Sequence, residues 1–259
     1  MPRILLVLAF LLILTASQAH AHFGMAVPDT STVTDSKQKA VGVRIAFAHP
    51  MEGEGMDMER PKAFFLAKGS AREDLAKTLS PDTFLDHKAW KATVPLHRPG
   101  IGYLVVEPEP YFESAEDTYI IHYTKTPLAI FGEEDGWEEP LGLKAEIVPL
   151  TRPFGNYAGN VFTGQVLLDG KPAANVTVEV EHYNTSGLKA PNEYFVTQAV
   201  RTDERGIFSY GIPWAGWWGF AGLCSDKSTL DHKGTPKPVE LGAVLWMEFL
   251  PPLKARQGK

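Results

Sequence analysis

The feature that most constrains this chain is a succession of short runs in which apolar and polar residues alternate, each ended by Gly, Pro or acidic residues. In VGVRIAF (41–47) every second residue is large and apolar, which is the pattern of a half-buried β-strand. Five further candidate strands follow in the first half, namely KAFFLAK, ATVPLHR, GYLVVEPE, TYIIHYTK and LKAEIVPL. Strands this short and this often interrupted predict an antiparallel sandwich, with short helices expected only at 71–79 and 82–90.

A cluster of turn residues at 151–160 (TRPFGNYAGN) separates this region from a second one with the same pattern. There, VFTGQVLLDGKPAANVTVEVEHYN predicts a strand, a tight turn at DGKP and a second strand. Val176, Val178 and Val180 share one face of that second strand because side chains alternate along a strand. We expect these valines, together with Phe208, to lie in a second core.

The order of strand, DGKP turn, strand, T-D-x-x-G-x-F and an aromatic G-W-W strand resembles the small transthyretin-like or carboxypeptidase-regulatory-like sandwich of many exported proteins. Such a fold hosts many unrelated functions, so this resemblance predicts architecture alone. The predicted fold class is all-β, with two antiparallel β-sandwich domains of the Ig-like or transthyretin-like kind, one at 22–152 and one at 153–259.

The amino terminus, residues 1–21, has the layout of a secretory signal peptide. Arg3 precedes an unbroken apolar run, and small residues follow at Ala19 and Ala21. The run is shorter than the roughly 20 residues of a membrane-spanning helix. We expect export to the periplasm and cleavage after Ala21, which makes His22 the first mature residue; cleavage after Ala19 is the alternative.

Charge and cysteine content exclude two classes of protein. The chain has 31 acidic and 25 basic residues, a formal net charge of −6, and no basic stripe, so nucleic acid is not expected as a partner. Cys224 is the one cysteine, so no intramolecular disulfide can form, and we expect it to be a small buried apolar residue.

Motifs of the common enzyme classes are missing from the sequence. It contains no G-x-S-x-G, P-loop, H-E-x-x-H or dinucleotide-binding motif. The acidic pairs Glu133–Glu134 and Glu138–Glu139 could in principle form an acid–base couple, but acidic pairs in a loop are usually solvated. We therefore expect a protein that is not an enzyme and has no organic cofactor.

One loop, HPMEGEGMDMERP, concentrates imidazole, thioether and carboxylate donors, among them His49, Met51, Glu52 and Met58. A flexible loop lets several such donors converge on a divalent transition metal. The alternative is an acidic surface loop, because Met and Glu are common and no tight H-x-x-H or C-x-x-C spacing is present.

His22 strengthens the metal interpretation. A histidine at a mature amino terminus can chelate through its own amine and its ring nitrogen together, and imidazole suits Ni, Cu and Zn. If cleavage occurs after Ala19, the terminus becomes HAH, whose amine, two backbone nitrogens and His22 imidazole could enclose Ni(II) or Cu(II). The alternative is a frayed terminus with an arbitrary first residue.

The other histidines follow strand parity or lie in polar segments. His122 shares a strand face with Ile120 and is either a core histidine or a metal ligand. His182 continues the valine face of its strand and is expected to be structural. Three histidines in polar surroundings are expected at the surface: His87, His97 and His232.

Several long stretches of the chain resemble one known family: AHAHFGM, FAHPMEGEGMDMERPK, PEPYFESAEDTYIIHYTK, GWEEPLGLKAEIVPLTRPFGNYAGNVFTGQVLLDGKP and DHKGTPKPVELGAVLW. They are similar to the domain-of-unknown-function family 4198 (DUF4198). In particular, they resemble its members described as the additional periplasmic component of energy-coupling-factor (ECF) nickel and cobalt transporters. The resemblance runs from His22 to Phe249.

This resemblance implies a periplasmic protein that captures Ni(II) or Co(II) and delivers it to an ECF-type permease in the membrane, with Cu(II) or Zn(II) as alternative cargo. By motif, the ligand positions carried over are His22, His49 and His122, with Met58 and Glu52 as further candidates. We predict that His22 and His49 share one metal ion, with His122 or a donor from the loop completing the shell.

A second class of function stays open, in which the chain is a cell-surface structural or carbohydrate-binding β-sandwich without metal. Exposed tryptophans on one flat platform would favour sugar stacking. Their burial, with histidines converging elsewhere, would favour the metal. The tryptophans concerned are Trp137, Trp214, Trp217 and Trp218.

Overall fold

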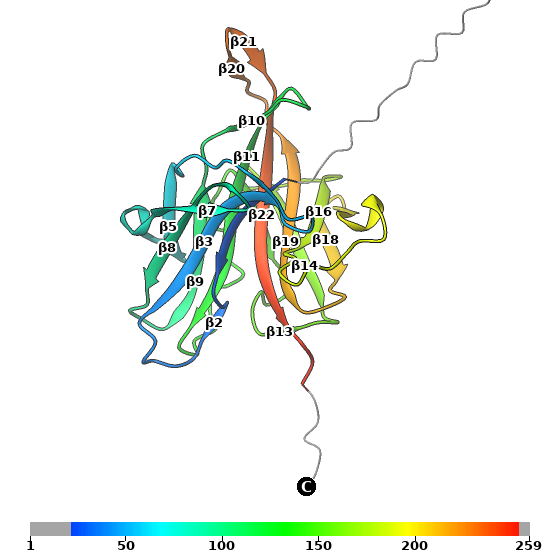
Figure 1. Cartoon of the computed structure of the whole chain (residues 1–259). Helices are drawn as coiled ribbons and strands as arrows, with labels where there is room; N and C mark the ends of the chain where they lie inside the picture. The colour runs from blue at the N-terminus through cyan, green and yellow to red at the C-terminus, as the bar shows by residue number, and fades with distance from the viewer. Residues whose placement is uncertain (1–21, 254–259) are drawn as a thin grey trace, which may run out of the picture.

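The computed structural model describes residues 22–253, which form β-sheets and almost no helix (Figure 1). Within that range the only helical segments are two short 3-10 turns, η1 (Ala76–Thr78) and η2 (Glu193–Phe195). Neither is long or apolar enough to span a membrane, and no other described segment is such a helix. The expected all-β fold class is confirmed, whereas the predicted signal peptide lies outside the described residues.

The first sheet contains His49 and begins directly after His22. Its five strands are β1 (Phe23–Pro28), β3 (Ala40–His49), β4 (Glu54–Met56), β7 (Ser80–Phe84) and β8 (His87–Pro95). The strand order is β1-β3-β8-β7, and β4 continues the pairing of β3 beyond the end of β8. All pairings in this sheet are antiparallel.

The largest sheet has eleven strands and contains segments from both halves of the chain. Along its main path, in spatial order, lie β17 (Gln198–Arg201), β16 (Thr177–His182), β19 (Gly216–Ser225), β22 (Val239–Leu250), β11 (Thr118–Ile130), β9 (Gly100–Glu107), β5 (Ala63–Lys68) and β6 (Ala71–Asp74). Three short strands attach to this path: β10 (Tyr111–Glu113) and β2 (Thr32–Val33) pair with β11, and β13 (Asn156–Tyr157) pairs with β22.

Two small sheets complete the fold. One consists of β12 (Ala145–Pro149), β14 (Val161–Leu168), β15 (Lys171–Pro172) and β18 (Ile207–Gly211). The other is a hairpin of β20 (Leu230–His232) and β21 (Thr235–Lys237), which projects beyond the sheets at the top of Figure 1.

Strand β22 joins the two halves of the chain. It pairs antiparallel with β19 on one side and parallel with β11 on the other, from Tyr119↔Val239 to Lys125↔Leu245. The sequence predicts antiparallel pairing, but parallel neighbours become possible here because the whole second half separates β11 from β22. One sheet thus continues past residues 151–160, and the division into two domains stays a prediction.

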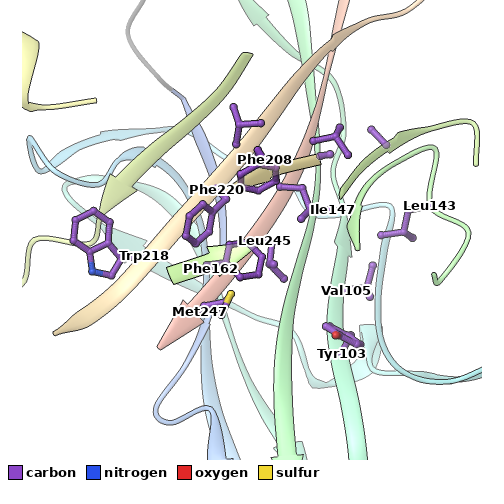
Figure 2. Close-up of a cluster of buried hydrophobic side chains, with 14 of the residues drawn as sticks. Tyr103, Val105, Leu143, Ile147, Phe162, Phe208, Trp218, Phe220, Leu245 and Met247 are labelled. Atoms are coloured by element: carbon purple, nitrogen blue, oxygen red, sulfur yellow. The ribbon is translucent and has the colours of Figure 1, made fainter. Parts of the chain in front are cut away.

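The main core also draws on both halves. It combines buried residues of β5, β9 and β12 with residues of β14, β18, β19 and β22, and Figure 2 shows aromatic side chains of this cluster gathered between the strands. Val178 and Val180 are fully buried and Phe208 is 3% exposed, which confirms their predicted place in a core. Val176 is only partly buried against that core. Cys224 is buried, as predicted.

The two predicted helices are wrong. Residues 71–79 form mainly β6 and η1, and residues 82–90 belong mainly to β7 and β8, which meet at a tight turn. Leu85 and Asp86 have φ of 50° and 64° there, and a type I′ hairpin turn requires positive φ at both central residues. Pairing of β8 with β7 and β3 buries Ala89 in a core, and such tertiary packing overrides a local helix preference.

Candidate metal centre

Strand pairing places His22 next to His49. β1 and β3 are antiparallel with Phe23 opposite Ala48, so continuing the register by one residue brings His22 opposite His49. The two imidazole rings have centroids 4.6 Å apart and are inclined by 52°. Directly opposed side chains on one face of an antiparallel pair are normally in contact, so the predicted proximity of these histidines follows from the register.

Aromatic rings enclose this pair. The His22 ring stacks on Phe47 with centroids 5.6 Å apart and an interplanar angle of 21°, and its centroid lies 6.1 Å from that of the Tyr111 ring. Only 8% of His22 and 7% of His49 is exposed. Burial of this kind shields both imidazoles from bulk water and restricts their orientations.

Glu113 also belongs to this corner, although the sequence analysis does not single it out. It ends β10, which pairs antiparallel with β11. Its Oε2 atom lies 2.9 Å from Nε2 of His22, and its Oε1 atom accepts a hydrogen bond from the Ala115 amide at 2.8 Å. Hairpin parity is the signal that could have found it, because YFESAEDTY places Glu113 on the same strand face as His122.

The contact with Glu113 defines which nitrogen of His22 carries a proton. Because an ionised carboxylate only accepts hydrogen bonds, a hydrogen bond from His22 to ionised Glu113 requires the proton on Nε2 and leaves the lone pair on Nδ1. Burial, with smaller effects of His49 and His122, lowers the pKa of His22 to about 4, against the opposite effect of Glu113. The His22 ring is therefore neutral at pH 7 and can donate a lone pair to a metal ion.

His122 has a different role in this structure. It is 2% exposed, it meets the Phe47 ring edge-on at 5.6 Å, and its Nδ1 accepts a hydrogen bond from the Gly24 amide at 3.3 Å. A neutral ring then has its proton on Nε2, which lies 3.9 Å from Oε1 of Glu240 without a hydrogen-bond partner in the described part of the chain. In this arrangement His122 anchors β1 just after His22, and its lone pair is already engaged.

Two glycines make room for this packing. A Cβ atom on Gly242, which is opposite His122 on β22, would lie 2.3 Å from Cδ2 of the imidazole. A Cβ atom on Gly24 would lie 2.4 Å from Oγ1 of Thr124. Both distances are far below van der Waals contact, so the burial of His122 and the close approach of β1 to β11 depend on glycine at these positions.

The remaining two candidates have separate surroundings. Met58 is 6% exposed, belongs to an apolar core cluster and lines a cavity of about 50 Å³ that is also lined by His122. Glu52 is exposed in the turn after β3, where its charge contributes to a raised pKa of Glu181. Met58 therefore lies in a core and Glu52 at the surface, although both belong to the same donor-rich loop.

Glu181 anchors the turn that follows His49. Its buried carboxyl group accepts hydrogen bonds from the Met51 amide at 3.2 Å and from the Thr197 hydroxyl at 2.5 Å. Burial raises the pKa of Glu181 to about 8, although these hydrogen bonds act in the opposite direction. A residue of the second half therefore positions the loop of the first half in which the sequence places most metal donors.

The number of clustered donor side chains limits what this corner offers a metal ion. Across residues 22–253, no three His, Cys, Asp or Glu side chains come together as a group that could hold a metal ion. The pair of His22 and His49 supplies two imidazoles.

The four tryptophans do not form one flat platform. Trp218 is 1% exposed and Trp214 is 42% exposed, with ring planes inclined by 51°. Trp217 packs against a different core cluster from the one that contains Trp218, because adjacent residues of a strand point to opposite faces. Trp137 packs against the main core.

His182 is buried, in agreement with its predicted structural role. Its ring lies 5.1 Å from that of Trp218 and 5.8 Å from that of Trp214, and burial lowers its pKa. Its Nδ1 has no hydrogen-bond partner among residues 22–253. The residue lines a cavity of about 870 Å³, whose walls are mainly apolar and also include Tyr210.

The three histidines predicted at the surface have different degrees of exposure. His97 is exposed. His87 is partly exposed, with Nδ1 at 3.3 Å from Oδ1 of Asp57. His232 is partly buried and stacks on Phe112 with ring centroids 3.7 Å apart.

A family comparison supports the resemblance drawn from the sequence motifs. Residues 19–226 match the family described as "Domain of unknown function (DUF4198)". The chain belongs to this family. The DUF4198 match includes His22, His49 and Glu113, and it ends before β22. Its description assigns no function, and no curated protein matches the chain.

Solved structures add little to this assignment. The D0-D1 domain of Intimin is 13% identical with a TM-score of 0.25, covering 89% of this chain and 100% of that chain. Trypsin-activated alpha-2-macroglobulin from Escherichia coli is 11% identical with a TM-score of 0.26, covering 90% and 16%. Fibronectin(III)-like modules of Clostridium thermocellum CbhA are 12% identical with a TM-score of 0.20, covering 91% and 100%. TM-scores this low carry no argument, so the fold is assigned from the strands themselves.

Proposed function

We propose that this DUF4198 protein is exported to the periplasm, binds Ni(II) or Co(II) at the corner formed by His22 and His49, and delivers the ion to an ECF-type permease. No catalysed reaction is part of this proposal. The observation that carries it is the cross-strand contact of two buried imidazoles at the first described strand. The transport role itself depends on the sequence resemblance.

Processing after Ala21 would add a third nitrogen donor. His22 would become the first residue, and its α-amino group and Nδ1 could bind one ion in a six-membered chelate, with the His49 ring as a neighbouring ligand. Nitrogen donors without thiolate suit Ni(II), Co(II), Cu(II) and Zn(II), whereas Mg(II) and Ca(II) prefer oxygen. Cleavage after Ala19 would leave the HAH chelate instead.

Calorimetric titration of the mature protein with Ni(II), Co(II), Cu(II) and Zn(II) tests metal binding. The sharpest control adds one alanine before His22, which keeps every side chain but converts the free amine to an amide. We expect this extension to weaken Ni(II) binding at least about tenfold, equivalent to about 1.4 kcal/mol. Equal binding by both proteins would contradict the chelate, and no binding by the mature protein would contradict the proposed function.

Export and delivery require their own measurements. Intact-mass analysis of the exported protein should show His22 as its first residue, whereas a start at His20 would support the three-residue chelate. Retention of the hydrophobic run would contradict both. Nickel uptake by cells that contain the permease should fall when His49 is replaced by alanine, and unchanged uptake would contradict delivery from this site.

A second candidate function is the binding of a carbohydrate or other small molecule without metal. It is favoured by the cavity of about 870 Å³ in the second half, which is lined by Tyr210, Trp214 and Trp218. Aromatic faces in a cavity of this size suit a ring-shaped ligand. Titration with oligosaccharides, followed by tryptophan fluorescence in the parent and in Trp214→Ala, discriminates this function from metal binding.

A further inference from the structure

The geometry points to Glu113 as the positioning residue that fixes the His22 ring for chelation of the metal through Nδ1 and the terminal amine. This inference rests on the proposed function, because it concerns how the same site presents its ligands. Glu113 itself is not a proposed ligand. Glu113 acts through His22. Its carboxylate contacts Nε2, the ring nitrogen farther from the backbone amine.

The first step of the argument is that the Glu113 carboxylate is itself held in place. One oxygen accepts the Ala115 amide at 2.8 Å and the other lies 2.9 Å from Nε2 of His22. The Glu113 side chain is 14% exposed. A carboxylate with both oxygens engaged and little exposure is a defined acceptor rather than a mobile surface charge.

The second step concerns the geometry of the imidazole ring. A six-membered chelate from the α-amine closes through Cα, Cβ, Cγ and Nδ1, whereas Nε2 lies at the far side of the ring. A proton on Nε2 that is donated to Glu113 therefore leaves free the one nitrogen that can close the chelate. Metal-bound histidines commonly donate their other N–H to a carboxylate, and loss of that partner typically lowers metal affinity 10–100-fold.

The third step is that the surroundings offer His22 few other orientations. Its ring stacks on Phe47 and lies near the rings of His49 and Tyr111. Rotation about the Cβ–Cγ bond would carry the Nε2 proton away from Glu113 into this mainly aromatic environment. Glu113 thus selects both the tautomer and the orientation of the ring.

The test combines nickel titration with nitrogen-15 NMR of the histidine rings in the metal-free mature protein. We expect His22 of the parent to show one tautomer, with the proton on Nε2, and Glu113→Ala to show a mixture. We also expect Glu113→Ala to bind Ni(II) about 10–100-fold more weakly. Glu113→Gln retains a neutral acceptor and should lie between the two.

Glu109→Ala is the matched control, because Glu109 lies just before β10 and its exposed carboxylate pairs only with Lys62, at 3.2 Å, among the ion pairs described for these residues. It should leave both readouts unchanged. A parent ring with its proton on Nδ1, or unchanged tautomer and nickel affinity in Glu113→Ala, would overturn the inference. Failure of the parent to bind any metal would instead contradict the proposed function, while the NMR comparison would still report on the Glu113 contact.

Discussion

The corner of His22 and His49 and the surroundings of His182 both contain buried imidazoles, yet their neighbours differ in kind. His22 has a second imidazole at 4.6 Å and a carboxylate at 2.9 Å. His182 has two indole rings beside it and an Nδ1 atom without a hydrogen-bond partner in the described part of the chain. Burial alone therefore does not distinguish a candidate ligand from a packing residue. The donor groups beside the histidine do.

The largest expected effect is a difference in Ni(II) affinity between variants of the two regions. Because His49 is a proposed ligand and His182 is not, His49→Ala should weaken Ni(II) binding by more than about 100-fold, beyond the usual effect of losing an outer-shell partner. His182→Ala should leave the affinity unchanged. Calorimetric titration of both variants provides the measurement, and equal losses in the two would refute the distinction between the regions.

The reverse contrast is expected for stability. His182→Ala leaves a cavity beside Trp214 and Trp218, so the free energy of unfolding should fall by about 2–4 kcal/mol. Denaturant unfolding at pH 7 measures this loss. A change below about 0.5 kcal/mol would show that His182 is not a packing residue.

The Gly242→Ala substitution tests how closely β22 packs against His122. The new Cβ would lie 2.3 Å from the imidazole, and such overpacking should cost about 1–3 kcal/mol of unfolding free energy. Gly211→Ala is the control, because a Cβ there meets nothing within 4 Å. Equal stability of the two variants in denaturant unfolding would contradict the close packing of His122 on β22.

The last expected effect is a pH dependence of stability that arises from His22, and it changes neither a ligand nor the packing. Its pKa is lowered from 6.5 to about 4 on folding, so the unfolded chain binds the proton more readily. Stability from this group is complete above pH 6.5 and falls as pH decreases toward 4, by at most about 1.4 kcal/mol per pH unit. NMR titration of the metal-free protein should show His22 titrating near pH 4, and a midpoint near 6.5 would contradict its burial beside His49.

Much of the fold could be predicted because the relevant signals are local. Alternation of polarity located the strand at 41–47 and the strand that carries Val176, Val178 and Val180, of which the last two are fully buried. It failed at 71–79 and 82–90, where short segments carry no decisive period. There the pairing of β6 with β5 and of β8 with β7 and β3 determines the structure. The contact of His22 with His49 was predicted from the short separation of the two segments. Glu113 was missed because it lies on the three-residue strand β10, which is too short to show an alternating pattern.

By itself, the sequence determined the all-β class, the buried faces of two strands and the residue types available for metal binding, since a period of two and side-chain chemistry are properties of short segments. Only the tertiary structure decided which donors meet. Register aligned His22 with His49, the β10–β11 hairpin delivered Glu113, and the Gly24 amide engaged His122. The parallel contact of β22 with β11 joins segments more than a hundred residues apart, and long-range pairings of this kind depend on packing energies summed over the whole sheet rather than on any local pattern.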